Sequence, residues 1–161
     1  PENVTSQIVV ALARIETPRF AFRILIGGSN RNLDQVKSAI EGDPRFEILS
    51  DVNQMGEQYR WADIGICAGG STNWEMCYFG LPRIMIELAE NQTPLARSIH
   101  DAGSAVNLGW YADFQPDLLL QHVLKLANSL HERERMAQRS RALVDGKGAG
   151  RVIKKLVDVL N

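Results

Sequence analysis

The spacing of apolar residues along the chain alternates between the period of a helix and the short runs of a buried strand. An opening helix is predicted by apolar residues three or four positions apart, at Val4, Ile8, Leu12 and Ile15. A short apolar run, Phe22–Ile26, then ends in small and polar residues over 27–30. That combination is typical of a buried strand that leads into a tight loop.

The same pattern repeats through the rest of the chain. Short strands are predicted over 46–49, 64–67, 82–86 and 105–108. Helices are predicted over 32–40, 55–62, 72–79 and 93–101, and two or three closing helices follow from Pro116 to Leu160. Strands that alternate with helices indicate repeated βαβ units, which need a parallel sheet with helices on both faces. The sequence therefore predicts an α/β fold with a doubly wound, Rossmann-like parallel sheet.

The order of the first elements departs from this pattern, because such a domain usually opens with a strand and this chain opens with a helix. A length of 161 residues fits a single domain, which we assign to residues 1–161. The chain begins with Pro1 and not with Met, so we expect a fragment that lacks a leading strand. In doubly wound folds the leading strand lies centrally.

The composition is that of a globular protein, with 45% hydrophobic and 23% charged residues. Basic and acidic side chains nearly balance, for a formal net charge of -1, which argues against nucleic acid as a partner. No apolar run approaches the roughly 20 residues that span a bilayer, and no secretion signal opens the chain. We expect a cytoplasmic protein with no membrane span.

The cysteines and histidines give no sign of a metal or redox centre. Cys67 and Cys77 fall in a predicted strand and a predicted helix, which is no disulfide framework and fits a reducing compartment. Their simplest interpretation is as small buried apolar residues. The histidines share no metal-ligand spacing with one another or with the cysteines, so we assign no metal and no cofactor. They are His100, His122 and His131.

The richest candidate for chemistry is the turn between the strand 64–67 and the helix 72–79. Gly69 and Gly70 let the main chain approach a ligand closely, and the next helix offers unpaired N–H groups at the positive end of its dipole. This combination favours an anion, typically a phosphate group. A Gly-Gly turn before a helix often serves packing alone, so the pattern by itself leaves both interpretations open.

Glu75 also has two interpretations. With Thr72 as the helix N-cap, Glu75 completes a capping box, which needs no ligand. Alternatively, its carboxylate accepts hydrogen bonds from a vicinal diol such as ribose, each worth about 1.5 to 3 kcal/mol. The two roles are compatible. Glutamine at this position would still cap the helix but would bind a diol less well.

A second glycine-rich segment near the C-terminus is interpreted as structural. Residues 146–151 read Gly-Lys-Gly-Ala-Gly-Arg, which superficially resembles a phosphate-binding loop. The segment lacks the Walker spacing and the Ser or Thr after the lysine, and it lies between predicted helices. We interpret it as a helix break.

One long run of residues carries a resemblance to a known family. Residues 62–82 read ADIGICAGGSTNWEMCYFGLP, and Glu90, Asn91 and Gln92 follow shortly after. This sequence resembles the UDP-sugar hydrolases of pseudaminic acid biosynthesis, the spore-coat polysaccharide biosynthesis protein family. That family is similar to the UDP-N-acetylglucosamine transferase that makes the lipid-linked peptidoglycan precursor. The resemblance extends from the first helix to Arg151, and its central run is the specific part.

The resemblance implies the C-terminal, nucleotide-binding half of a two-domain GT-B protein. It places the UDP site on the glycine-rich turn, where main-chain amides would hold the diphosphate, and on Glu75, which would grip the uridine ribose. It gives Val52 a role in reading uracil through its main chain, and it places Asn91 and Gln92 against the sugar or its phosphates. The residues of the turn are Gly69, Gly70, Ser71, Thr72 and Asn73.

The resemblance also implies an activity, which is hydrolysis of the anomeric C–O bond of a UDP-linked amino or deoxy sugar with release of UDP. The general base of that family is a histidine of the N-terminal half, so no residue of this chain is assigned a catalytic role. The family's leading strand and its glycine-rich turn are absent here. Two alternatives stay open: a GT-B glycosyltransferase that uses a UDP-N-acetylhexosamine, and a non-catalytic UDP-binding or assembly module.

Overall fold

The computed structural model describes residues 3–17, 19–27 and 32–160. The predicted tight loop over 28–30 lies outside these residues. Every predicted strand and helix is present within two residues of its expected bounds. The first half contains α1 (Val4–Ala13), β1 (Phe22–Ile26), α2 (Leu33–Ala39), β2 (Phe46–Ser50) and α3 (Met55–Trp61).

The second half continues the alternation. It contains β3 (Gly65–Ala68), α4 (Thr72–Phe79), β4 (Arg83–Glu87), α5 (Thr93–Asp101) and β5 (Val106–Trp110), with short 3-10 helices η1 (Glu90–Gln92) and η2 (Tyr111–Asp113). The chain then closes with α6 (Pro116–Asn128), α7 (Leu130–Leu143) and α8 (Gly148–Leu160). The predicted helix break is confirmed, because Gly146 lies with φ 73° between α7 and α8.

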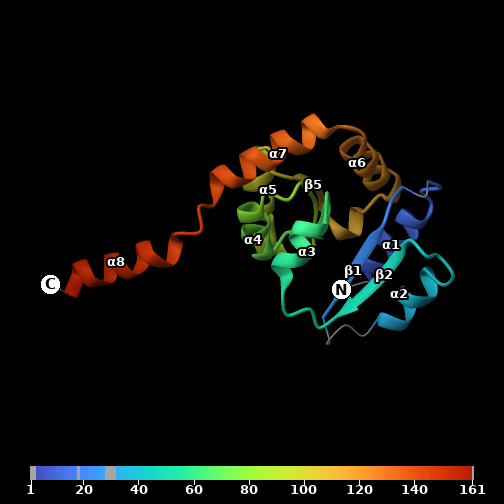
Figure 1. The fold of residues 1–161 in the computed structure, drawn as a ribbon, viewed down its shortest axis with the longest axis horizontal. Helices are drawn as coiled ribbons and strands as arrows, with labels where there is room; N and C mark the ends of the chain where they lie inside the picture. Colours follow the sequence, from blue (N-terminus) through green and yellow to red (C-terminus); the bar gives the residue numbers. More distant parts are fainter. Residues whose placement is uncertain (1–2, 18, 28–31, 161) are drawn as a thin grey trace.

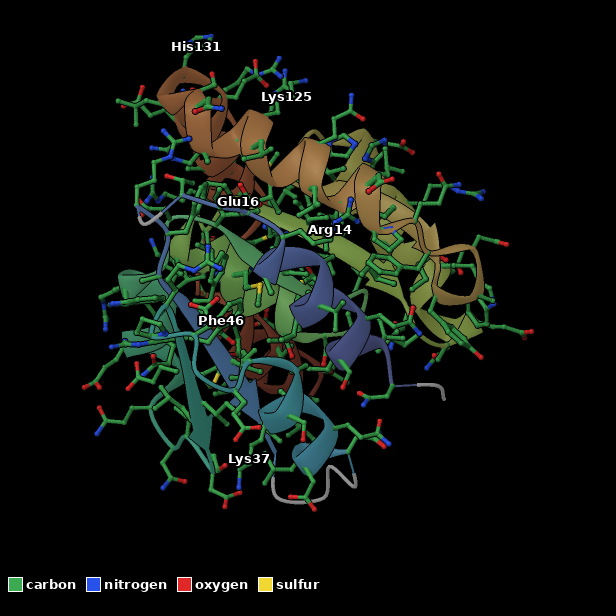
Figure 2. The ribbon with its side chains drawn as sticks, turned by 90° about the vertical axis from the view of Figure 1, so that its right-hand side faces the viewer. Arg14, Glu16, Lys37, Phe46, Lys125 and His131 are labelled. Carbon is green, nitrogen blue, oxygen red and sulfur yellow. The ribbon has the colours of Figure 1, made fainter. Side chains whose placement is uncertain are left out.

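All strand pairs are parallel, which confirms the predicted α/β class. The strands form two sheets, one of order β1-β2 and one of order β3-β4-β5. Helices α1 and α2 lie beside the β1-β2 pair, and α6 and α7 run along the side of the molecule away from α2 (Figure 1). Figure 2 shows Phe46 on the strand pair, and Lys125 and His131 on the outer helices at the far end.

The core is built on β4, whose five residues are all buried. Because successive side chains of a strand point to opposite faces, Ile84 and Met85 face different layers. Ile84 packs in a cluster with residues of α1, α6 and α7, whereas Met85 packs with Ala96 and Ile99 of α5. Helices therefore cover both faces of the β3-β4-β5 sheet, as the doubly wound prediction requires.

A groove of about 450 Å³ separates the two sheets. Its walls are β1 and β3, and it is also lined by α1 through Ile8 and Leu12 and by α3 through Gln58 and Tyr59. Within the described residues no ladder joins β1 to β3. The single predicted sheet is thus present in two parts.

Along this groove, the main-chain N–H and C=O groups of β1 and β3 have no strand partner among the described residues. In β1, the Phe22 N–H donates to Arg45 O at 2.7 Å and Ile26 O accepts from Asp51 N–H at 3.3 Å, so even-numbered residues pair with β2. Because main-chain groups alternate sides along a strand, the N–H and C=O groups of Arg23 and Leu25 face the groove. In β3, the Gly65 N–H donates to Pro82 O at 2.8 Å, so the main chain of Ile66 faces the groove from the other side.

Helix α8 leaves the rest of the molecule and has no buried residue (Figure 1). Asp145 and Arg151 form an ion pair with an N–O distance of 2.6 Å across the start of this helix. This pair, together with a main-chain hydrogen bond from Lys147, lowers the pKa of Asp145 to about 2. One face of α8 exposes large apolar side chains, Val152, Ile153, Leu156, Val157, Val159 and Leu160.

Candidate functional site

The glycine turn lies where β3 leaves the sheet, and neighbouring chain packs tightly against it. The Gly69 N–H donates to Ile86 O at 3.1 Å, which extends the β3-β4 ladder by one residue. A Cβ atom on Gly69 would lie 3.1 Å from the Cβ of Ala96 and 3.3 Å from the Cβ of Gln92. Glycine at this position therefore allows α5 and the residue before it to approach the main chain more closely than a larger residue would.

The amide groups that follow Gly69 fall into two sets. Asn73 N–H donates to Gly70 O at 3.1 Å and Trp74 N–H donates to Ser71 O at 2.9 Å. The amides of Gly70, Ser71 and Thr72 donate to no group in the part of the chain that the structure describes. Ser71 and Thr72 are exposed at the start of α4. Three unpaired N–H groups at the positive end of a helix are suited to an anion.

Asn73 shapes the turn with its side chain. The residue is fully buried, and its Nδ2 donates to Ala68 O at 2.8 Å and to Gly70 O at 2.9 Å. These bonds fix the carbonyls on both sides of Gly69, so the direction of the free amides is set from behind. The sequence prediction gave Asn73 an amide that holds the diphosphate; in the structure this amide is already paired with Gly70 O, and the side chain is the part that acts on the turn.

The Asn73 side chain is in turn held by Arg83, which is fully buried in β4. Arg83 Nε donates to Asn73 Oδ1 at 2.7 Å. Its Nη1 and Nη2 donate to Leu81 O at 3.3 Å, Ser104 O at 3.2 Å, Ser140 Oγ at 3.2 Å and Cys77 Sγ at 2.8 Å. Sequence reasoning missed this residue. The available signal was a basic residue inside an apolar strand that is buried on both faces.

Glu75 lies in the first turn of α4 and is exposed. Its Oε2 accepts a hydrogen bond from Tyr59 OH at 2.9 Å, and Tyr59 itself is 5% exposed. Burial, and then the neighbouring Glu75, raises the pKa of the Tyr59 phenol, so the phenol stays a donor. The predicted capping box is absent, because Ser71 is the N-cap and its side chain accepts no hydrogen bond from the helix. Glu75 is held by α3 instead, with its carboxylate accessible to solvent.

Gln92 and Asn91 lie in η1, which follows β4. Gln92 packs on Gly69, and its Oε1 accepts from Leu88 N–H at 2.9 Å, so the structure brings Gln92 to the glycine turn. Asn91 is exposed beside it. Val52 lies in the loop after β2 and is half-buried. Since the strands are parallel, this loop is at the same edge as the glycine turn.

A buried carboxylate that sequence reasoning missed anchors the end of β4. Glu87 is 7% exposed, and its Oε1 accepts from Asn107 Nδ2 at 2.6 Å while Oε2 accepts from the Thr93 hydroxyl. Glu87 thus ties the start of α5 and strand β5 to β4. These bonds fix the position of η1 and its Gln92 side chain relative to the turn.

Within residues 3–17, 19–27 and 32–160, no three His, Cys, Asp or Glu side chains come together in a way that could hold a metal ion. None of the helices among the described residues combines the length and the apolar character needed to cross a membrane.

Comparison with known proteins adds independent information. Residues 3–155 match the family described as the glycosyltransferase family 28 C-terminal domain. The chain is 29% identical over 135 residues to the spore coat polysaccharide biosynthesis protein SpsG of Bacillus subtilis, covering 84% of this chain and 40% of that protein. It is 31% identical over 140 residues to the UDP-N-acetylglucosamine–N-acetylmuramyl-(pentapeptide) pyrophosphoryl-undecaprenol N-acetylglucosamine transferase of Salinibacter ruber, covering 81% and 37%.

Solved structures agree on the fold. Acinetobacter baumannii MurG superimposes with a TM-score of 0.80 and 20% identity, over 98% of this chain and 46% of that one. WaaG, a glycosyltransferase involved in lipopolysaccharide biosynthesis, superimposes with a TM-score of 0.68 and 16% identity, over 97% and 42%. The fold is therefore that of the C-terminal domain of a GT-B protein. The chain spans about 40% of the length of the relatives it matches.

These matches correct the activity expected from the sequence. The prediction of a UDP-sugar hydrolase is wrong, because the matching family is one of glycosyltransferases and the relative from Salinibacter ruber is named as a transferase. The likeness to the spore-coat protein is confirmed, whereas the assignment to a hydrolase of pseudaminic acid biosynthesis has no support. The alternative that the sequence left open, a glycosyltransferase, fits better.

Proposed function

The chain belongs to the glycosyltransferase family 28 C-terminal domains, and from this membership we propose that it is the nucleotide-binding half of a glycosyltransferase whose donor is a UDP-N-acetylhexosamine. The observation that carries the proposal is the set of unpaired amides at Gly70, Ser71 and Thr72 beside the exposed carboxylate of Glu75. The amides can donate hydrogen bonds to a phosphate, and the neighbouring carboxylate can accept hydrogen bonds from a diol. A nucleoside diphosphate presents both of these groups, in its phosphates and its ribose.

The diphosphate would lie on the glycine turn. Gly69 keeps the turn close to Gln92, and Asn73 fixes the carbonyls of Ala68 and Gly70, so the main chain that carries the three amides is held in place. When the acceptor oxygen attacks the anomeric carbon, the C1–O bond to the diphosphate breaks and its electron pair stays on UDP. Preorganised amides stabilise that growing charge more than they stabilise the bound donor, which lowers the barrier.

The ribose would be held by Glu75. Because Tyr59 donates to Oε2 of this carboxylate and is itself buried, the carboxylate is oriented before a ligand arrives. The remaining lone pairs are available to the two ribose hydroxyls. The main chain at Val52 would contact uracil, and Asn91 and Gln92 would face the sugar or its phosphates.

The rest of the protein would supply the acceptor site and the general base, because this chain contributes a leaving-group site and covers only part of its relatives' length. The groove between β1 and β3 fits one further parallel strand, placed directly before α1. Such a strand would pair with the free main chain of Arg23, Leu25 and Ile66 and join the two sheets into one. Its carboxyl end would then adjoin the glycine turn at the switch point of the sheet.

Hydrogen exchange in the full-length protein tests this strand. We expect the amides of Arg23, Leu25 and Ile66 to be protected to the same degree as the paired amides of Ile24 and Cys67. Rapid exchange at the first three positions, with the other two protected, would show that the groove stays open and would reject the strand.

The nucleotide site is tested by calorimetric titration of the full-length protein with UDP, ADP and uridine. We expect UDP to bind more tightly than either of the others. Glu75→Gln should weaken UDP about tenfold, since a hydrogen bond to a charged group contributes about 1.5 to 3 kcal/mol. The matched control is Glu134→Gln, an exposed residue of α7, which should leave UDP affinity unchanged. Failure of UDP to bind the wild-type protein would reject the proposal.

Transfer is tested separately from binding. With a UDP-N-acetylhexosamine as donor, we expect release of UDP to require an added acceptor. The glycosyltransferase assignment fails if the full-length protein binds UDP but transfers no sugar to any acceptor offered. That outcome would leave a non-catalytic UDP-binding module as the better description.

A further inference from the structure

Arg83 carries a positive charge into the interior without a negative partner. The side chain is fully buried, and its five acceptors are carbonyl, amide, hydroxyl and thiol groups. Among the residues that the structure describes, no carboxylate forms an ion pair with it. Hydrogen bonds to neutral groups lower the cost of burying a charge, but they do not neutralise it.

The position of this charge relates it to the glycine turn. Arg83 bonds Asn73 Oδ1 at 2.7 Å, and the Nδ2 of the same amide group bonds Gly70 O at 2.9 Å. One side chain therefore separates the guanidinium from the free amides of Gly70, Ser71 and Thr72. The charge of Arg83 acts on an anion at these amides with little screening, because the intervening space is protein and not water.

We propose that Arg83 is the buried counter-charge of the anion bound at the glycine turn, and that it acts through Asn73 as a positioning residue. This inference rests on the proposed nucleotide site. Arg83 does not touch the ligand. It fixes the carbonyls of the turn through the Asn73 amide, and its charge raises the electrostatic potential behind the three N–H groups. The diphosphate supplies the negative charge that the hydrogen-bond partners of Arg83 lack.

The thiol of Cys77 also lies against the Arg83 guanidinium. Cys77 Sγ accepts from Arg83 Nη2 at 2.8 Å, and a thiolate there would neutralise the guanidinium without any ligand. Cys77→Ser keeps a hydrogen-bond acceptor but cannot carry the charge. We expect this variant to bind UDP as the wild type does. A rise in UDP affinity in Cys77→Ser would assign the counter-charge to the thiolate and overturn the inference.

The decisive variant places a carboxylate beside Arg83 from the side away from the turn. Ser140 of α7 is buried, and its Oγ accepts from Arg83 Nη1 at 3.2 Å. Ser140→Asp would give the guanidinium an internal partner and leave its bond to Asn73 in place. Ser140→Asn has the same size and no charge, so the pair of variants isolates the effect of charge from the effect of volume.

The full-length variants are titrated with UDP and with uridine. We expect Ser140→Asp to bind UDP roughly tenfold more weakly than Ser140→Asn, because a neutralised guanidinium no longer attracts the diphosphate. Uridine, which has no phosphate, should bind both variants equally. Without ligand, Ser140→Asp should melt at a higher temperature than Ser140→Asn, since it pairs a buried charge. Equal UDP affinities for the two variants would overturn the inference.

Substitution of Arg83 itself gives a second readout. Arg83→Lys keeps the charge but cannot bridge Asn73 and Ser140 at once, whereas Arg83→Met removes the charge. We expect the ratio of UDP to uridine affinity to fall furthest in Arg83→Met and to be partly retained in Arg83→Lys. A ratio unchanged in Arg83→Met would contradict the proposal. If wild-type protein binds no UDP, the proposed function fails; if it binds and the ratio is unaffected, only the role of Arg83 fails.

Discussion

The two sheets of the molecule are stabilised in different ways. The β1-β2 pair is only partly buried, and its ion pair between Arg23 and Glu47, at 2.8 Å, lies on the face away from the Phe22 and Phe46 rings, which stack at 4.5 Å against the core. In the β3-β4-β5 sheet the polar interactions lie inside, around the buried Arg83. Apart from Val52 in the loop after β2, the residues proposed to bind UDP lie at the second sheet.

This difference shows why the glycine turn is a suitable place for a ligand. A buried polar network is satisfied only in one arrangement, because each group that loses its partner inside the protein is penalised. Exposed ion pairs allow water to replace either partner at little cost. The turn after β3 is therefore held in a defined geometry from within.

The largest expected difference between the sheets is in core stability. Ile84→Ala in β4 should lower the free energy of unfolding by about 4 kcal/mol, because Ile84 is fully buried between helices. Ile48→Ala in β2 should lower it by only about 1 kcal/mol, because this side chain is half-buried at the smaller sheet. Urea denaturation of both variants measures the two values. Equal losses would show that the two sheets are equally packed.

The next effect concerns the close approach at the glycine turn. Gly69→Ala should lower UDP affinity about tenfold, because its Cβ would lie 3.1 Å from Ala96 and must push α5 and Gln92 away from the turn. Gly27→Ala, at the end of β1, is the matched control, since a Cβ there meets nothing within 4 Å. Calorimetric titration with UDP compares the two. Wild-type UDP affinity in Gly69→Ala would show that the close approach of α5 to residue 69 is not needed for UDP binding.

A smaller effect is expected at the Tyr59 hydroxyl. Burial and Glu75 raise the pKa of this phenol above its ordinary value of about 10, so the stability gained from the neutral phenol is full below that pH and is lost as the pH rises further. Ultraviolet absorbance of tyrosinate should therefore rise equally in wild-type protein and Tyr59→Phe up to about pH 11, while circular dichroism shows both folded. An extra tyrosinate in the wild type over this range would mean that Tyr59 is solvated.

The smallest effect is expected at a half-buried ion pair beside β2. Arg45 donates to Asp43, which lowers the pKa of that carboxyl, so the stability from this pair is present above the ordinary pKa of about 4 and is lost as the pH falls through the lowered value. Asp43→Asn should destabilise the protein slightly at pH 7 and not at about pH 2. Thermal melts at both values check this, and a loss as large as that of Ile48→Ala would contradict the contrast drawn between the sheets.

The pattern of the sequence predicted the order of elements well, because short apolar runs and helical spacing recur without interruption from Val4 to Leu160. It also located the turn at Gly69. The internal contacts were harder to predict, since they depend on tertiary packing. Nothing near Asn73 in the sequence indicates a hydrogen bond to Arg83, ten residues later. Local capping rules predicted that Glu75 forms a capping box with Thr72, whereas the packing of α3 makes Tyr59 its hydrogen-bond partner.

The central claim is that the free amides of Gly70, Ser71 and Thr72 hold the diphosphate of UDP. Amide chemical shifts in the full-length protein, recorded with saturating UDP and with uridine, test it most directly. We expect UDP to move the signals of these three residues strongly, whereas uridine should move them little and act at Glu75 and in the loop of Val52. If UDP binds and leaves all three amides unmoved, the anion lies elsewhere and the account is wrong.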